Sequence, residues 1–87
     1  MLMTANEARQ RVEEGKAKVE RMLKYNAEGY ANSTVSNAII KATTELKKSC
    51  EVEEMETEKE NKYLQVYLEK RGYTVCFLTT NKIKIEW

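Results

Sequence analysis

The fold is decided by residues 57–87, which read TEKENKYLQVYLEKRGYTVCFLTTNKIKIEW. Thr57 and Glu60 stand three positions apart, the spacing of a capping box, so a helix is predicted to begin there. Gly72 is predicted to end this helix, because glycine adopts the left-handed conformation without steric cost. The side of the helix that would face a core consists of Tyr63, Leu64, Tyr67, Leu68 and the aliphatic stem of Arg71.

Two strands are predicted after this helix. Apolar and polar residues alternate over residues 73–80 and again over residues 83–87. If the two strands pair as a hairpin, residues that face each other lie on the same side of the sheet, so Phe77 must face an odd-numbered partner such as Ile83. The connecting loop is therefore predicted to have an odd number of residues, with Asn81 at a positive φ.

A third strand is predicted before the helix, between Ser49 and Met55, where Cys50 and Val52 alternate with glutamates. Such a charged strand suits the edge of a sheet, because like charges discourage pairing with another chain. The predicted fold class is therefore α+β, in which residues 49–87 form a small β-α-β-β unit that ends in a hairpin. If the strands on either side of the helix are parallel neighbours, the crossover between them is expected to be right-handed.

The first half of the chain is predicted to be helical. Thr4 and Glu7 form a second capping box, and apolar or small residues then recur at spacings of three and four. Gly29 and the polar residues after it offer a break that no proline enforces, so a helix pair and one bent helix of some forty residues, ~60 Å long, both remain open. The stripe before the break contains Ala8, Val12, Gly15, Val19, Met22 or Leu23, Asn26 and Tyr30, and the stripe after it contains Val35, Ala38, Ile39, Ala42 and Leu46.

Residues 1–48 are predicted to be a helical oligomerisation region that shares one structural domain with the unit at residues 49–87. Ordering the 87 residues costs ~130 kcal/mol of conformational entropy at ~1.5 kcal/mol per residue. With one Phe and one Trp, the chain has few large apolar side chains whose burial could offset that cost. A narrow stripe at three-four spacing packs best on another helix. We therefore expect copies of the chain to associate through this region, and the alternative is a monomer that folds the helix back onto its own sheet.

Charge and composition exclude several classes of function. With 15 basic and 14 acidic residues the chain has no global field that would attract nucleic acid or an anionic membrane. The acidic run from Glu51 to Glu60 is interpreted mainly as a solvated face. There is no histidine and the three glycines stand singly, so the usual general base, a histidine metal site and a phosphate loop are missing. We predict no catalytic residues, no cofactor and no metal site.

The cysteines and the N-terminus indicate the compartment. Cys50 and Cys76 are too far apart for a CxxC motif and are expected to be free thiols, although strands that lie side by side would permit a disulfide. Nothing at the N-terminus resembles a signal peptide, and no segment has the roughly twenty apolar residues needed to cross a bilayer. The chain is therefore expected to be cytoplasmic, with no membrane partner.

Both ends of the chain resemble a type of small accessory protein found in tailed bacteriophages. The phrase MTANEAR stands at residues 3–9, YLEKRGYTV at residues 67–75 and KIKIEW at residues 82–87. The resemblance implies action in the cytoplasm of a host cell. Some small phage proteins of this size antagonise host immunity, either by blocking an effector protein or by holding its nucleotide messenger between subunits.

These patterns together predict a non-enzymatic oligomeric binding protein that antagonises host antiviral defence by sequestering a nucleotide signal or blocking an effector. A nucleotide would be held by cations on its phosphate, a tyrosine stacked on its base and short polar groups at its edges. The predicted ligand-binding residues are Arg71, Lys82 and Lys84 for phosphate, Tyr73 or Tyr67 for stacking, and Asn81 and Thr80 for polar edges. Each also has a structural interpretation, the tyrosines as core or helix-end packing and the lysines as protection of a sheet edge.

Two further classes of function remain open. A virion or scaffolding protein would associate without a small ligand. A nucleic-acid accessory protein would use the basic residues between Lys16 and Lys24, but the acidic residues between Glu13 and Glu20 repel phosphate, so nucleic acid is an unexpected partner.

Overall fold

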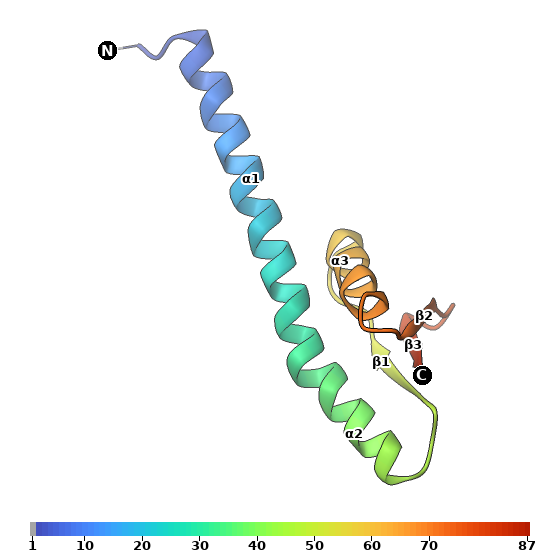
Figure 1. Cartoon of the computed structure of the whole chain (residues 1–87). Helices are drawn as coiled ribbons and strands as arrows, with labels where there is room; N and C mark the ends of the chain where they lie inside the picture. The colour runs from blue at the N-terminus through green and yellow to red at the C-terminus, as the bar shows by residue number, and fades with distance from the viewer. Residues whose placement is uncertain (1) are drawn as a thin grey trace.

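The fold is a long helical rod with a small sheet and a second helix packed beside its C-terminal half (Figure 1). This computed structural model describes residues 2–87, so residue 1, with which the predicted region 1–48 begins, lies outside the described residues. The predicted α+β class is confirmed. The elements are α1 (Ala5–Tyr30), the π-helical turn η1 (Ala31–Val35), α2 (Ser36–Thr44), β1 (Ser49–Glu53), α3 (Glu58–Glu69), β2 (Thr74–Phe77) and β3 (Lys82–Glu86).

Helical structure runs without a break from Ala5 to Thr44, which confirms the single long helix over the pair of shorter ones. Thr4 caps its start by accepting a hydrogen bond of 3.2 Å from the backbone N–H of Glu7. Gly29 does not end the helix, and the hydroxyl of Ser33 donates a 2.7 Å bond to the Gly29 carbonyl instead. The described residues extend 65 Å along their longest axis, in agreement with the predicted length.

The turn η1 explains how the second half of the rod packs. A π-helical turn contains one residue more than the α-helix it replaces, so it rotates everything after it by roughly 100°. With this rotation, buried Val35 and Ala42 face the same side as buried Ala27 and Ala31. On a plain α-helix the same four residues would also fall within an arc of about 80°, so the turn adjusts the phase of α2 within one broad face of the rod.

Leu46 does not belong to the second stripe, and its predicted place on the helix is wrong. The helix ends at Thr44, Leu46 has a positive φ of 62°, and its side chain is 92% exposed. The backbone N–H of Lys47 donates a 2.8 Å bond to the Ala42 carbonyl, a closure that requires a left-handed residue just past the helix end. Here that position is filled by a leucine where glycine would be usual.

Helix α3 has the predicted boundaries and caps. Thr57 accepts a 3.2 Å bond from the backbone N–H of Glu60, and its hydroxyl donates a 2.8 Å bond to the Glu60 carboxylate. At the other end Gly72 has a φ of +90°, and the Tyr73 N–H donates to the Leu68 carbonyl at 3.2 Å. The predicted start and stop signals of this helix are therefore confirmed.

The sheet is antiparallel, with the strand order β1-β3-β2. Strand β1 is at the edge, as its glutamates predicted. Both outer strands run antiparallel to β3, so β1 and β2 are parallel to each other but are separated by the closing strand. The expectation that they might be direct neighbours is wrong, because the hairpin places β3 between them.

The hairpin follows the predicted register. Phe77 faces Ile83, and the Leu78 N–H donates a 2.8 Å bond to the Lys82 carbonyl, which leaves the three-residue loop 79–81. Asn81 has a φ of 59°, as predicted. Strand β2 ends at Phe77, earlier than the alternation over residues 73–80 indicated, because the chain is already entering the turn.

One face of the sheet forms the core and the other faces solvent. Helix α3 and the rod from Ala27 onward cover the core face, where Leu64, Ile83 and Ile85 are fully buried. Cys50 shares the face of its partner Ile85, whereas Cys76 shares that of Lys84, so the two free thiols point to opposite sides of the sheet. A disulfide between them would therefore require a different fold.

Candidate functional site

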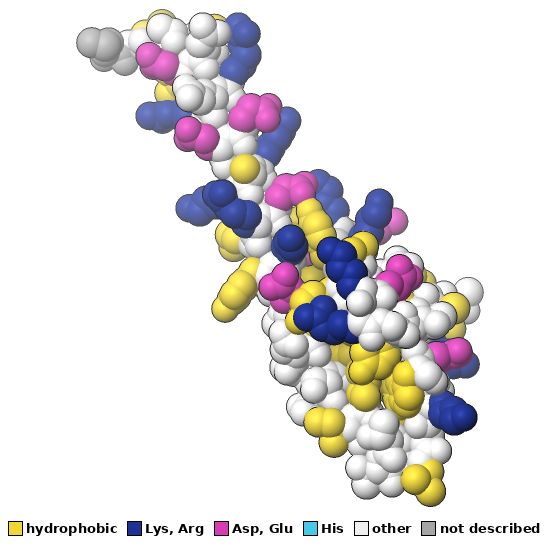
Figure 2. Space-filling model, in the orientation of Figure 1, with side chains coloured by type: hydrophobic (Ala, Val, Ile, Leu, Met, Phe, Trp, Pro, Cys, Tyr) yellow, Lys and Arg dark blue, Asp and Glu magenta, His cyan; other side chains and the backbone are white. Residues whose placement is uncertain are grey.

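The clearest functional surface is the first part of the rod, Ala5–Met22, which we call the arm; the rest of the described chain is the head. Every residue of the arm is exposed, and the arm projects well beyond α3 (Figure 1). Figure 2 shows small hydrophobic areas along it between basic and acidic side chains. The head therefore leaves this stretch of helix without tertiary cover.

A row of apolar and small side chains, the arm stripe, follows the arm at alternating spacings of four and three. Val12 and Val19 are each 55% exposed and Met22 is 57% exposed, values that a core would not leave to such residues. The spacing is that of the a and d positions of a heptad, with valine at a. The arm stripe consists of Ala8, Val12, Gly15, Val19 and Met22.

The base of the arm is fastened to α3 by a polar link. The Tyr63 hydroxyl donates a hydrogen bond to the Glu20 carboxylate, and Lys59 forms an ion pair with the same carboxylate at 3.2 Å. The bond from Tyr63, followed by the charge and bond of Lys59, lowers the pKa of Glu20 below its usual value of 4.5. The same hydrogen bond raises the pKa of Tyr63. The link fixes the direction in which the arm leaves the head.

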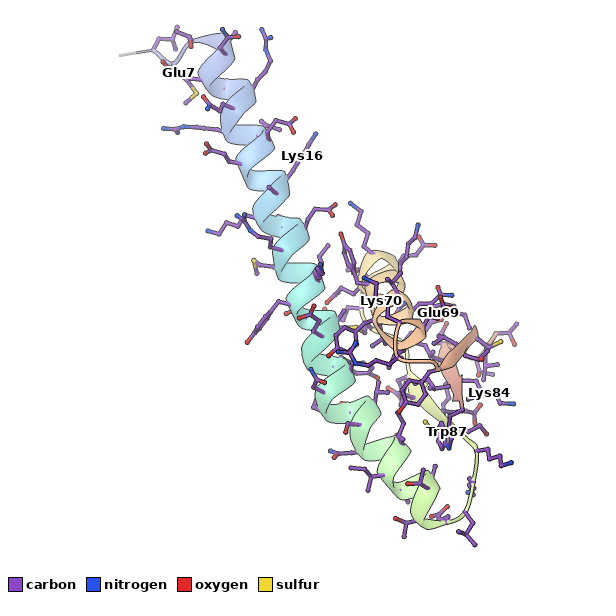
Figure 3. All side chains as sticks on the ribbon, viewed as in Figure 1. Glu7, Lys16, Glu69, Lys70, Lys84 and Trp87 are labelled. Atoms are coloured by element: carbon purple, nitrogen blue, oxygen red, sulfur yellow. The ribbon has the colours of Figure 1, made fainter. Side chains whose placement is uncertain are left out.

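A second candidate site is a cationic groove between α1 and α3, with a volume of about 420 Å³. The Arg71 guanidinium lies over the Tyr67 ring, 3.7 Å from its centroid, and donates a 3.1 Å bond to the Tyr67 carbonyl. Lys24 and Lys70 line the same groove, and Figure 3 shows Lys70 on α3 where that helix faces the rod. The groove thus combines cations with an aromatic ring, the groups that bind phosphates and bases.

The predicted ligand-binding residues are distributed over four places in the chain. Tyr67 and Arg71 lie together in the cationic groove. Thr80, Asn81 and Lys82 line a small hollow of about 340 Å³ at the hairpin turn. Lys84 is on the open face of the sheet, paired with Glu86 at 3.0 Å, and Tyr73 packs edge-on against Trp87 with ring centroids 6.2 Å apart. A single site that used all seven would have to form between copies of the chain.

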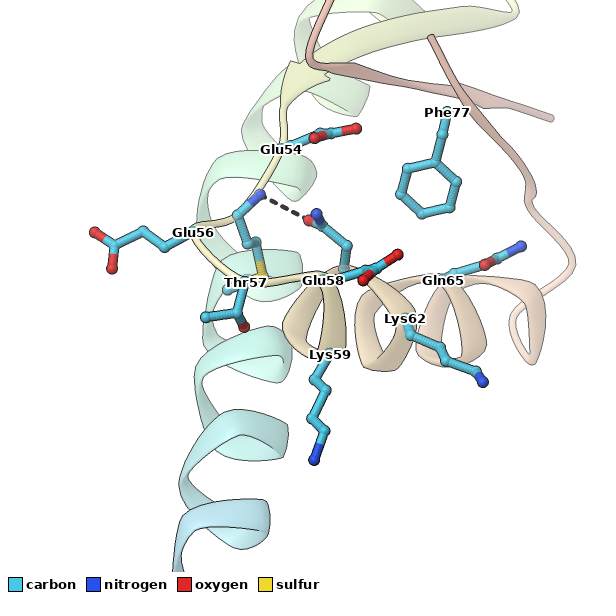
Figure 4. Close-up of a pocket in the computed structure, with 10 residues that line it drawn as sticks. Glu54, Glu56, Thr57, Glu58, Lys59, Lys62, Gln65 and Phe77 are labelled. Atoms are coloured by element: carbon cyan, nitrogen blue, oxygen red, sulfur yellow. Dashed lines mark hydrogen bonds between the residues drawn. The ribbon is translucent and has the colours of Figure 1, made fainter. Parts of the chain in front are cut away.

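The sequence pattern identified neither Lys24 and Lys70 as neighbours of Arg71 nor Asn61 as a structural residue. Asn61 is buried, and its side-chain carbonyl accepts a 2.7 Å bond from the Met55 N–H (Figure 4). Asn61 lines an open hollow of about 730 Å³. The ring of Phe77 borders the same hollow and is 43% exposed. The available signal was a short polar residue on the side of α3 that also carries Leu64 and Leu68.

The acidic run does not form a metal centre within residues 2–87. Glu51 lies opposite Lys84 on the open face of the sheet, whereas Glu54, Glu56 and Glu58 border the hollow beside Phe77. No group of three or more acidic or thiol side chains in this part of the chain could hold a metal ion.

Comparison with known proteins places this chain in no family: no family model, no curated protein and no solved structure matches it. None of the helices in residues 2–87 combines the length and the apolar character that crossing a membrane requires. The function must therefore be argued from the surfaces themselves.

Proposed function

We propose that this chain is a non-enzymatic binding protein that works by docking its arm onto another polypeptide. The partner is either a sister copy, which gives an oligomer, or an effector protein that becomes blocked. The resemblance of both chain ends to phage accessory proteins supplies the setting, antagonism of host antiviral defence in the cytoplasm. A scaffolding role would need the same docking without a small ligand.

One observation carries this proposal: the arm stripe is continuous, regularly spaced and left uncovered by the head. Most helices in proteins are stabilised by packing of their apolar face, and the arm has no such packing within the chain. A row of exposed apolar residues of this kind marks a surface that another molecule covers. The helical shape of the arm is supported by the Thr4 cap and by the 3.9 Å ion pair between Glu13 and Lys16. Such a prepared helix lowers the entropic cost of docking.

The test uses a stripe variant and a matched control. Val12→Glu with Val19→Glu places two charges on the stripe, and Gln10→Glu with Ala17→Glu places two charges on the opposite side of the same helix. Native mass spectrometry of protein purified from producing cells should show an added polypeptide, sister or foreign, on the 10.1 kDa chain. The added mass should survive in the control and disappear in the stripe variant. A bare monomer in all three samples would refute the proposal.

Sequestration of a nucleotide is a second candidate, favoured by the cationic groove. A guanidinium has five N–H donors, and the bond of Arg71 to the Tyr67 carbonyl uses one of them. Arg71→Ala should therefore abolish any nucleotide-sized mass carried by the protein while assembly persists. Lys41→Ala, on the exposed side of α2 and outside the groove, is the control for loss of one positive charge. An unchanged nucleotide load in Arg71→Ala would remove this groove from consideration.

A further inference from the structure

We propose that the arm docks onto an acidic amphipathic helix of another protein and not onto the arm of a second copy. This inference rests on the proposed function, since it names the chemistry of the partner that covers the arm stripe. Three features of the arm carry it: the charges beside the stripe, the size of the residues within it, and the absence of bulky apolar groups.

The positions that flank the arm stripe are basic on both sides. With Val12 and Val19 at heptad position a, Arg9 and Lys16 fall at e, and Arg11 and Lys18 fall at g. All of these side chains are exposed, and Figure 3 shows Lys16 on the arm beyond the head. Positions e and g lie against a partner helix and decide which partner is accepted.

The acidic residues of the arm occupy other positions. Glu13 and Glu20 fall at b, and Glu7 and Glu14 fall at c, on the outer sides of the helix. There they support the helix itself, as in the 3.9 Å pair between Glu13 and Lys16. They are directed away from a helix seated on the stripe, so they would not neutralise the flanking cations of a second arm.

A second copy therefore meets the arm with like charges in either direction. In a parallel pair, g of one helix faces e of the next heptad on the other, which sets Arg11 against Lys16. In an antiparallel pair, e faces e and g faces g, which sets Arg9 against Lys16 and Arg11 against Lys18. A partner with glutamate or aspartate at these positions replaces each repulsion with an attraction, and opposed charges of this kind select between partners.

The sizes of the stripe residues favour the same partner. Ala8 and Gly15 occupy d, and a Cβ added at Gly15 would meet no atom within 4 Å, so space is open there. A parallel second copy would bring glycine to glycine and alanine to alanine at d, which leaves those layers poorly filled. A foreign helix with leucine at d can fill the space above Gly15, because its larger side chains fit into the small positions.

An anionic membrane fits the arm less well than an acidic helix does. Helices that lie in a membrane surface bury Trp, Phe or Leu side chains, and residues 5–22 contain none of these. The stripe offers only valine, methionine, alanine and glycine. Its apolar content suits the narrow seam between two helices.

The test probe is a synthetic four-heptad peptide with isoleucine at a, leucine at d and glutamate at every e and g position. The full-length protein should sediment as a monomer at micromolar concentration and bind this peptide, with an affinity that falls at least tenfold between 50 mM and 500 mM salt. Reversal of the flank charges by Arg9→Glu, Arg11→Glu, Lys16→Glu and Lys18→Glu should abolish that binding. The reversed protein should instead bind the same peptide carrying lysine at e and g, a gain that misfolding cannot mimic.

The outcomes separate this inference from the proposed function. A dimer of the unmodified protein that Val12→Glu with Val19→Glu dissolves would overturn the acidic partner and leave docking through the arm intact. Binding to vesicles of phosphatidylserine and phosphatidylcholine, with none to the peptide, would also overturn it. A monomer that binds no peptide and no vesicle would overturn the acidic partner, whereas docking through the arm is overturned only if native mass spectrometry shows no added polypeptide.

Discussion

Asn61 ties the segment after β1 to the first turn of α3 through its side chain. Its carbonyl accepts the Met55 N–H at 2.7 Å in a largely buried position. Asn61→Ala should lower the free energy of unfolding by about 1–3 kcal/mol, because it leaves that backbone donor without a partner. Urea denaturation measures the loss. Asn61→Asp keeps an acceptor and should cost less, so equal losses in the two variants would argue against the hydrogen bond as the cause.

Leu46 adopts a left-handed backbone conformation, with a φ of 62°, at the turn that closes α2. This conformation is sterically unfavourable for a leucine. Its side chain is 92% exposed and supplies no packing in return. Leu46→Gly should therefore raise the free energy of unfolding by about 0.5–1 kcal/mol, after the greater freedom of glycine in the unfolded chain is allowed for. Thermal unfolding tests this, with Leu46→Ala as the control that keeps the strain. A melting temperature that falls in the glycine variant contradicts this account of the turn.

Glu20 makes the attachment of the arm dependent on pH. The hydrogen bond from Tyr63, and to a lesser extent Lys59, lowers the pKa of Glu20 in the folded chain. The stabilisation that this link gives to the folded chain is therefore complete above the ordinary pKa of 4.5 and is lost as pH falls through the lowered pKa. Tyr63→Phe should move the pKa of Glu20 back up toward 4.5. The chemical shift of the Glu20 carboxyl carbon, followed by NMR between about pH 2 and pH 7, measures this pKa directly. That range extends roughly two pH units to either side of an ordinary carboxyl titration. Identical titration curves would show that the link does not exist in solution.

Roles that depend on residues nearby in the sequence could be predicted, whereas roles that depend on how the chain folds around a residue could not. Thr57, Gly72 and Asn81 each act within a few residues, through a cap or a positive φ, so their roles could be predicted. Asn61 and Leu46 depend on what lies beside them after folding. A leucine in particular is ordinarily counted with an apolar stripe, and only the helix end reveals it as the turn residue.

At the scale of elements, η1 sets the relation between the arm and the head. Val35 and Ala42 lie on the side of the rod that carries Ala27 and Ala31. Deletion of Thr34 removes the extra residue of the turn, so it should restore a plain α-helix in which α2 keeps its orientation to the core. The free energy of unfolding should fall by clearly less than the ~2 kcal/mol that exposure of Val35 would cost.

A matched control is a deletion in the regular part of α2. Removal of Asn37 also shortens the rod by one residue, but it turns Ala42 away from the core by roughly 100° and should lower the free energy of unfolding more than removal of Thr34 does. Urea titrations of both deletions give the comparison. A larger loss for Thr34 than for Asn37 would contradict the interpretation of the turn as one inserted residue.

The sequence revealed elements better than their assembly. Periodicity predicted helical structure in the first half, the edge strand and the hairpin register, because each depends on neighbours in the chain. It left one helix and a helix pair both open, and it gave no sign of η1, because the apolar residues around that turn recur at the ordinary α-helical spacing of four. The candidate ligand residues were grouped by type, and the fold then distributed them among α3, the hairpin turn, the open face of the sheet and the strand end at Tyr73.

As a whole, the molecule divides into a head with a core and an arm without one. The part of the rod from Ala27 onward packs on the sheet and α3, whereas the part before Leu23 is exposed. Association between copies of the chain stays a prediction. Near-neutral net charge hides an uneven distribution, because the positions that flank the arm stripe are basic and the acids of the arm occupy the positions outside them. We infer that the head positions and orients the arm, and that the arm makes the functional contact.

Hydrogen exchange of the arm amides tests this account most directly. In the lone, monomeric protein the amides of residues 12–18, which lie before the Glu20 link to α3, should exchange quickly because the head does not cover them, while those of β3 remain slow. Addition of the acidic helical peptide should protect the arm and leave β3 unchanged. Strong protection of the arm in the lone monomer would show that the head already covers the stripe, and no docking partner would then be needed.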